Sequence, residues 1–245
     1  MKMTAASRTG CVRSQNEDMI LLGSRFIRND AFSTQVNLTK NDRYLVAVAD
    51  GMGGHSSGDV ASSDVLHNLQ FFYYDLPVGF QQEQFRRMMN EWLDAINNYI
   101  TSKGRADEQF KGMGTTLVGF AYYEGEFYYL NCGDSRLYRY RQGELSQLST
   151  DHSLSNMLGS EKRMSVITNC IGGGCTTSYL DMEMISEDVL SGDSYLLCSD
   201  GLTDMLSNHK ISQLLSCNIN ANGLCEAAIQ AGGLDNVSCC IVKIY

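Results

Sequence analysis

The stretch Arg43-Tyr44-Leu45-Val46-Ala47-Val48-Ala49-Asp50-Gly51 decides how the fold is interpreted. An unbroken apolar run here ends abruptly in an aspartate and a glycine, which is typical of a buried strand that enters a loop. The next residues, 53–58, are small and polar, and a helical pattern of apolar residues begins near Val60. This stretch therefore predicts a core strand that carries a carboxylate to the loop at its end.

Apolar periodicity predicts helices and strands along the rest of the chain. Residues 81–103 form the clearest predicted helix, because their apolar side chains recur every three or four positions. Residues 114–150 instead read as an antiparallel meander of short β-prone runs. Further strands are expected at 194–198 and 237–244, and further helices near 203–215 and 222–231. This order of elements favours an α+β fold over a regular βαβ alternation.

Length and composition limit the class of protein. The chain has 245 residues and one proline, Pro77, and no linker-like tract divides it, so we expect a single domain over 1–245. A net charge of −9 argues against nucleic acid as the main partner. No apolar run approaches the ~18–20 residues that a membrane helix needs, and the first residues lack the apolar core of a secretory signal. We expect no membrane insertion.

The nine cysteines indicate the redox environment. They are scattered and have no zinc-site spacing, which favours free thiols in a reducing compartment. A cytoplasmic protein is therefore expected.

Four aspartates lie at the ends of predicted core strands: Asp50 in DGMGG, Asp134 in GDSR, Asp200 in SDGL and Asp235 in LDNVS. Carboxylates gathered at one edge of the sheets would repel one another unless cations neutralised them. A site built from oxygen ligands selects Mg²⁺ or Mn²⁺ over zinc. Calcium is the competing hard ion, but the chain has no EF-hand spacing.

Other hydrolytic chemistries find little support in the sequence. The chain contains no Cys-x5-Arg loop, no GxxxxGK[ST] loop, no HExxH pair and no GxSxG elbow. Of the four histidines, only His55 lies in the glycine-rich loop after Asp50, and it is the one to watch as an acid. His67 falls in a helical pattern and is expected to be structural.

Seven segments, in order, carry a resemblance to a known family. They are SRTGCVRSQNED (7–18), VADGMGGHSSGDVAS (48–62), GTTLVG (114–119), NCGDSRLYRY (131–140), LSTDHSL (148–154), LLCSDGLTDML (196–206) and DNVSCCIV (235–242). In these segments the chain resembles the metal-dependent serine/threonine protein phosphatases of type 2C, especially their bacterial branch. The resemblance implies a four-layer α-β-β-α sandwich, in which two antiparallel sheets are flanked by helix pairs and the metal centre lies at one edge.

The same resemblance implies roles for individual residues. Asp50 would bridge two Mn²⁺ or Mg²⁺ ions, and Gly51 would offer its carbonyl to one of them. Asp200 and Asp235 would complete the other ion's ligands, and Glu17 would hold a metal directly or through water. Asp134 matches the position that helps to bind a third, weaker ion in bacterial members, and Asp18 is expected outside the direct ligands.

Arg13 matches the phosphate-binding arginine of the family, and a guanidinium suits two phosphate oxygens. The implied reaction is in-line attack of a metal-activated water on phosphoserine or phosphothreonine, in which Arg13 and Asp50 are the catalytic residues. The implied partner is a phosphorylated protein, a target of a Ser/Thr kinase. The chain is expected to act as a monomer.

The sequence departs from the family at three places. Some members of the family have a histidine directly after Asp-Gly. This chain has Met52 at that position, as bacterial members do. The flap after DHS is expected to be short, and Gly172-Gly173-Gly174 is expected to be a flexible point behind it. Residues 24–42 read as a polar connection, either a disordered tip or a partner-binding loop.

Two other functions stay open at this point. One is a catalytically silent scaffold with the same fold, since fold alone does not imply activity. The other is hydrolysis of a small phosphoester by the same metal centre.

Overall fold

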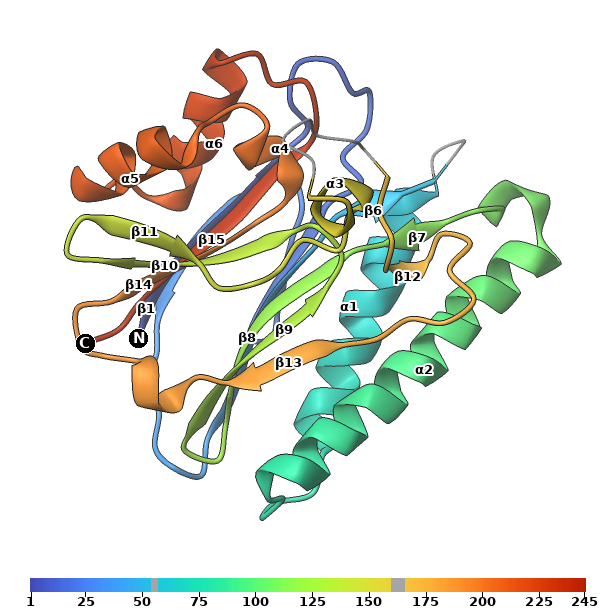
Figure 1. Cartoon of the computed structure of the whole chain (residues 1–245), viewed down its shortest axis with the longest axis horizontal. Coiled ribbons are helices and arrows are strands. Elements are labelled where there is room, and N and C mark those ends of the chain that lie inside the picture. The colour runs from blue at the N-terminus through green and yellow to red at the C-terminus, as the bar shows by residue number, and fades with distance from the viewer. Residues whose placement is uncertain (54–56, 160–165) are drawn as a thin grey trace.

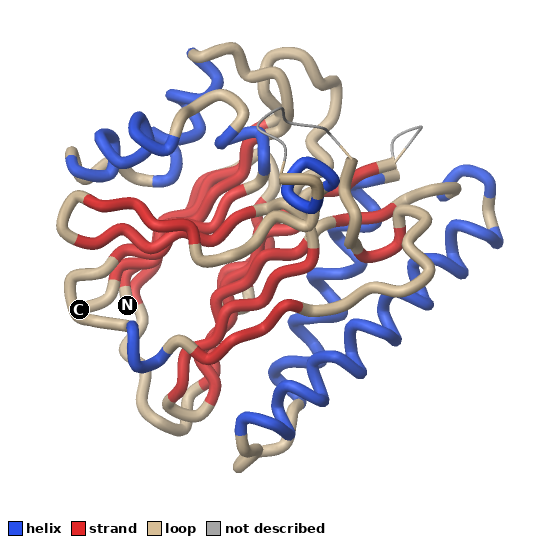
Figure 2. The backbone as a smooth tube through the Cα atoms, in the orientation of Figure 1, coloured by secondary structure: helices blue, strands red, loops and turns tan. Residues whose placement is uncertain are grey.

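The computed structural model of the chain describes residues 1–53, 57–159 and 166–245. Within these ranges, two six-stranded sheets and a small three-stranded sheet are present, and every pairing between their strands is antiparallel. The two large sheets lie against each other, and helices cover the outer face of each (Figure 1, Figure 2). The predicted four-layer α-β-β-α arrangement is confirmed.

The first large sheet contains both ends of the chain. Its strand order is β11-β10-β14-β15-β1-β4. Its strands are β1 (Lys2–Arg8), β4 (Ala31–Gln35), β10 (Arg136–Arg141), β11 (Glu144–Gln147), β14 (Ser194–Cys198) and β15 (Val237–Lys243).

The second large sheet is built around β5, the apolar strand that leads to Asp50. Its order is β13-β9-β8-β5-β2-β3. Its strands are β2 (Met19–Leu22), β3 (Arg25–Ile27), β5 (Arg43–Ala49), β8 (Leu117–Tyr123), β9 (Glu126–Cys132) and β13 (Asp181–Met184).

Strand β5 shows why its apolar run is unbroken. Successive side chains of a strand point to opposite faces. Leu45 and Ala47 belong to the hydrophobic cluster under the helices, whereas Val46 and Val48 belong to the cluster between the two sheets. From residue 45 to residue 49 both faces of the strand are therefore buried, which explains why this run is apolar throughout.

Helices close both outer faces. The second sheet is covered by α1 (Gly58–Asp75) and α2 (Gln82–Ala106), and the first by α4 (Asp200–Thr203), α5 (Asn208–Ser216) and α6 (Ala221–Gln230). Short helices α3 (Leu154–Met157), η1 (Glu108–Phe110) and η2 (Ser186–Asp188) lie in connections. In α2 the predicted apolar stripe is buried, with Phe85, Met89, Leu93 and Ile100 almost fully covered.

Three parts of the sequence prediction differ from the structure. Strand β1 was not predicted, because Lys2–Arg8 is poor in β-branched and aromatic residues; it is a strand because it pairs with β15 and β4 on its two sides. The single helix expected near 203–215 is two helices, and Ser207 caps the second by accepting from the Lys210 amide. Residues 24–42, expected as a polar connection, contain the edge strands β3 and β4.

A three-stranded sheet joins the loops at one end of the molecule. It consists of β6 (Gly51–Met52), β7 (Gly114–Thr115) and β12 (Ile171–Gly172), with β7 in the middle. The Gly172 amide donates to Asn97 Oδ1 and the Gly173 amide donates to the Met113 carbonyl. Gly172-Gly173-Gly174, expected to be a flexible point, is thus anchored at its first two residues.

In the described part of the chain, no helix combines the length and the apolar character needed to span a bilayer.

Candidate metal centre

One cavity gathers the predicted site residues from five loops. Its volume is about 560 Å³, and Arg13, Glu17, Asp50, Gly51, Asp134, Asp200 and Asp235 all line it. Asp50, Asp134, Asp200 and Asp235 each lie close to the end of a strand, Gly51 begins β6, and Arg13 and Glu17 lie in the connection between β1 and β2. The strand-end positions read from the sequence therefore converge.

The backbone of Asp50 is held from the β7–β8 connection. The Thr116 amide and the Thr115 hydroxyl both donate to the Asp50 carbonyl, at 2.9 and 2.8 Å. The Asp50 amide donates in turn to Thr116 Oγ1 at 3.1 Å. Burial, together with the charges of other carboxylates including Asp18 and Asp200, holds the pKa of Asp50 well above its ordinary value. A rigid backbone thus presents a carboxylate that needs a positive partner in order to ionise.

Glu17 and Gly51 meet the start of α1. The Gly58 amide, in the first turn of α1, donates to Glu17 Oε1 at 3.2 Å. Burial raises the pKa of Glu17, and this hydrogen bond opposes the increase. A Cβ atom on Gly51 would lie 2.1 Å from the Gly58 carbonyl oxygen and 2.5 Å from that of Glu17. Only glycine fits at position 51.

Asp18 lies behind the cavity rather than in its wall. Its side chain is fully buried, and its Oδ2 accepts from the Ser199 hydroxyl at 2.8 Å. Its Oδ1 has no hydrogen-bond partner among the described residues. Burial raises the pKa of Asp18 to about 7. Asp18 does not line the cavity and stays a predicted supporting residue rather than a direct ligand.

Arg13 and Asp235 form an ion pair at the rim of the cavity. Arg13 Nη2 donates to Asp235 Oδ2 at 2.7 Å, and the second oxygen of Asp235 accepts from the Asn236 amide. The hydrogen bond and the charge of Asp235 raise the pKa of Arg13. Arg13, the predicted phosphate-binding residue, is therefore in direct contact with Asp235, a predicted metal ligand.

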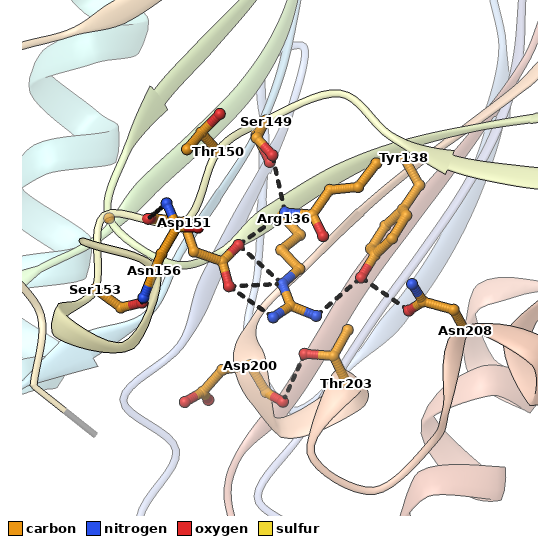
Figure 3. A network of polar contacts seen from close by, with 12 residues as sticks. Arg136, Tyr138, Ser149, Thr150, Asp151, Ser153, Asn156, Asp200, Thr203 and Asn208 are labelled. Atoms are coloured by element: carbon orange, nitrogen blue, oxygen red, sulfur yellow. Dashed lines mark hydrogen bonds and ion pairs between the residues drawn. The ribbon is translucent and has the colours of Figure 1, made fainter. Parts of the chain in front are cut away.

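A half-buried network lies beside the loops that carry Asp134 and Asp200 (Figure 3). Arg136 binds Asp151 through Nε and Nη2, the latter at 2.6 Å, and its Nη1 donates to the Tyr138 hydroxyl. Arg136 stands two residues after Asp134, and it pairs across the sheet with Cys198, two residues before Asp200. The Arg136 fork therefore ties β10 to Asp151, and β10 in turn pairs with β14, the strand before Asp200.

The chemistry of this cavity fits hard divalent cations. The acidic residues that line it offer oxygen atoms, the ligands that Mg²⁺ and Mn²⁺ prefer. Among residues 1–53, 57–159 and 166–245, however, no three Asp, Glu, His or Cys side chains are arranged as a ready set for one ion. The Arg13–Asp235 pair occupies one Asp235 oxygen. The donor types themselves fit Mg²⁺ or Mn²⁺.

Several cavity residues were not predicted. Asp204 also lines the cavity and lies four residues after Asp200. Because this spacing puts two side chains on one side of a helix, it could have indicated Asp204 as a site residue. Thr116 and the thiols of Cys170 and Cys175 also line the cavity, and no local signal indicated them. Val166 and Ile167 show that the segment after DHS borders the cavity. His55 lies outside the described residues.

Comparison with known proteins places the chain in a family. Residues 24–222 match the family described as protein phosphatase 2C. The chain belongs to this family. The match covers most of the chain and includes the loops that carry Asp50, Asp134 and Asp200.

Individual protein phosphatase 2C relatives agree with this assignment. PstP, a serine/threonine protein phosphatase of Mycobacterium tuberculosis, is 31% identical over all of this chain, which spans 45% of the length of PstP. The solved serine/threonine phosphatase of S. agalactiae aligns over 100% of both chains, with a TM-score of 0.84 and 28% identity. The PstP catalytic domain, solved with two manganese ions, aligns over 98% of both chains, with a TM-score of 0.75 and 31% identity.

Proposed function

We propose that this protein phosphatase 2C member hydrolyses phosphoserine and phosphothreonine in proteins with the help of divalent cations. The observation that carries the proposal is the shared cavity, in which one arginine and five predicted acidic ligands from separate loops meet. The names of the relatives support the reaction class. Because the chain spans about half the length of PstP, substrates and partners are proposed from the cavity's chemistry.

The proposed ligands are Glu17, Asp50, Gly51, Asp200 and Asp235 for two Mn²⁺ or Mg²⁺ ions, with Asp134 at a weaker third site. Support comes from their common cavity and from the two manganese ions in the PstP catalytic domain. Cations held here supply Lewis-acid activation of water and offset the charge of the phosphate.

The protein's own groups have separate tasks in this proposal. Arg13 offers a guanidinium fork to two phosphate oxygens, for which it leaves Asp235. The threonines at 115 and 116 keep the backbone of Asp50 fixed while its carboxylate faces the cavity. The Arg136–Asp151 contact and the pairing of β10 with β14 position the loops of Asp134 and Asp200. Such fixed positions matter, because misplacement by about 1 Å can cost a hundredfold in rate.

We further propose a cytoplasmic monomer that acts on targets of a Ser/Thr kinase. The nine cysteines are all free thiols, which supports a reducing compartment. Elution at the mass of one chain in size-exclusion chromatography with light scattering is expected.

The deciding experiment compares Asp50→Asn with wild type. Phosphate release from a phosphothreonine peptide is measured with Mn²⁺, with Mg²⁺ and with a chelator, beside p-nitrophenyl phosphate and a nucleotide as small substrates. Metal-dependent release from the peptide that is lost in a folded Asp50→Asn protein supports the proposal. The exposed Asp94 on α2 provides the matched control, Asp94→Asn, which should retain full activity.

Two results contradict the proposal. No release from any phosphopeptide by folded, metal-loaded wild type favours the scaffold. Efficient release from the small substrates alone favours a small-molecule phosphoesterase.

A further inference from the structure

Two thiols touch each other in the wall of the cavity. Cys170 Sγ and Cys175 Sγ are 3.1 Å apart, and both residues line the cavity. The residues between them include Gly172, Gly173 and Gly174, which all have positive φ, and the Cys175 amide donates to the Gly172 carbonyl at 2.9 Å. This tight turn is what brings two cysteines five residues apart into contact.

The two thiols differ in access. Cys170 is 3% exposed, whereas Cys175 is partly exposed at the cavity. A reagent in the cavity can therefore reach Cys175, while Cys170 stands directly behind it. The chain contains a useful contrast in Cys225 and Cys239, whose sulfurs are 3.7 Å apart but are both fully buried in the core under α6.

The turn that carries these thiols is connected to Asp50 through hydrogen-bonded strands. Ile171 pairs with Thr115 and Gly172 pairs with Gly114, while Thr115 pairs in turn with Gly51. Thr115 also donates its hydroxyl to the Asp50 carbonyl. A Cβ atom placed on Gly173 would be 2.9 Å from Cys170 Sγ and 3.6 Å from Met52 Sδ, so the turn also lies close to the residue after Gly51.

We propose that Cys170 and Cys175 are an oxidative modification site, where hydrogen peroxide forms a reversible disulfide that alters the cavity wall. The peroxide first oxidises the Cys175 thiol to a sulfenic acid, and one water leaves. The Cys170 sulfur then displaces the sulfenic oxygen, which departs with the Cys170 proton as a second water, and the S–S bond forms. The peroxide gains the two electrons that the thiols lose. A dithiol reductant reverses the change.

The geometry provides a route by which this bond can act on the metal centre. An S–S bond is about 2.05 Å long, so the two sulfurs approach by about 1 Å. Any movement of the turn with them passes through its hydrogen-bonded strand β12 to β7 and hence to the Asp50 loop. We expect oxidation to lower phosphopeptide turnover on the order of tenfold to a hundredfold. This effect on turnover rests on the proposed phosphatase function, whereas formation of the disulfide does not.

The experiment uses the full chain with Cys11→Ser and Cys217→Ser, which removes the two exposed thiols and prevents cross-linking between molecules. The protein is treated with a small excess of hydrogen peroxide, blocked with N-ethylmaleimide and cleaved after Arg163 and Tyr179. The resulting fragment contains Cys170 and Cys175 as its only cysteines. Mass spectrometry is expected to show this fragment unblocked and lighter by two hydrogens, and dithiothreitol is expected to restore both thiols and turnover.

Variants make the outcome specific. Cys175→Ser should abolish the mass change and the peroxide sensitivity, whereas Cys170→Ser should leave a sulfenic acid on Cys175 that dimedone traps. The Cys225–Cys239 pair should stay reduced throughout. A fragment that stays fully reduced, or a bond from Cys175 to the buried Cys132 instead, overturns the proposal. A disulfide that forms without change in phosphopeptide turnover overturns its link to the metal centre.

Discussion

Arg13 donates from Nη2 to Oδ2 of Asp235 at 2.7 Å, which joins two residues 222 positions apart in the sequence. Both side chains are substantially exposed, at 54% and 35%, so the pair itself contributes little to stability. Its importance lies in what each partner gives up. Arg13 cannot bind phosphate with this nitrogen while it holds Asp235, and Asp235 cannot offer this oxygen to a cation.

Replacing Arg13 by alanine should therefore have two opposite effects. Loss of the phosphate-binding fork should lower kcat/KM for a phosphopeptide on the order of a hundredfold. Release of Asp235 and removal of a nearby positive charge should strengthen Mn²⁺ binding by about twofold to fivefold, the size of an exposed ion pair. Turnover assays and isothermal titration calorimetry measure the two effects. Arg87→Ala, on the exposed face of α2, is the control, and unchanged kcat/KM in Arg13→Ala would refute the assigned role.

Gly51→Ala should damage both the fold and the centre. The new Cβ would overlap the carbonyl oxygens of Gly58 and Glu17, which are backbone atoms that cannot rotate away. Overpacking of this kind lowers the free energy of unfolding by about 1–3 kcal/mol. Urea unfolding tests this, with Gly119→Ala as the control, because the nearest atoms there belong to the Leu130 side chain at 3.2 Å. An equal loss in both variants would contradict the close approach at Gly51.

Mn²⁺ should stabilise the folded protein by binding to the carboxylates that repel one another without it. At a free concentration one hundred times Kd, a single site adds about 2.7 kcal/mol to the free energy of unfolding. Wild type should therefore melt at a higher temperature with Mn²⁺ than with a chelator, as measured by calorimetry. Asp50→Asn should lose most of this increase, because the substitution removes the charge of a proposed metal ligand. A full increase in Asp50→Asn would show that the ions bind elsewhere.

Asp193 should make stability depend on pH. Burial of this carboxylate raises its pKa, but hydrogen bonds from Arg141 and from the Leu190 amide outweigh burial and leave the pKa below its ordinary value. A lowered pKa means stabilisation that is present above the unfolded-state pKa, about 3.9, and is lost as pH falls through the folded-state pKa. Asp193→Asn should cost roughly 1.5–3 kcal/mol at pH 7, the range for hydrogen bonds to a charged group.

The measurement is urea unfolding of wild type and Asp193→Asn over a range of pH. The difference between the two proteins should be constant near neutral pH and should shrink once the medium is more acidic than about pH 4. Asp188→Asn, whose side chain is exposed in the same connection, is the control. A difference that grows toward acid pH would contradict the direction of the pKa shift.

Much of the fold was predictable because a buried element has a recognisable pattern of apolar residues in its own sequence. The unbroken apolar run of β5 and the three-and-four spacing in α2 each report the surfaces that they bury. The edge strands β3 and β4 have no such pattern, since their side chains are mostly exposed or half-buried and their backbone pairing decides their conformation. Strand β1 was missed for a related reason: its small residues Ala5 and Ala6 are buried by the layers that pack on its two faces, Ala5 between the two sheets and Ala6 under the helices.

The sequence by itself determined the type of chemistry: aspartates next to glycines at strand ends, an arginine spaced before Glu17, and motifs in the order of a phosphatase family. These features are local, because a turn and a strand end require particular residues nearby. Only the tertiary structure decided which groups meet. The Arg13–Asp235 pair and the position of the Cys170–Cys175 turn beside the Asp50 loop both depend on packing between distant segments. No local pattern encodes such contacts, because they arise from the three-dimensional pairing of strands.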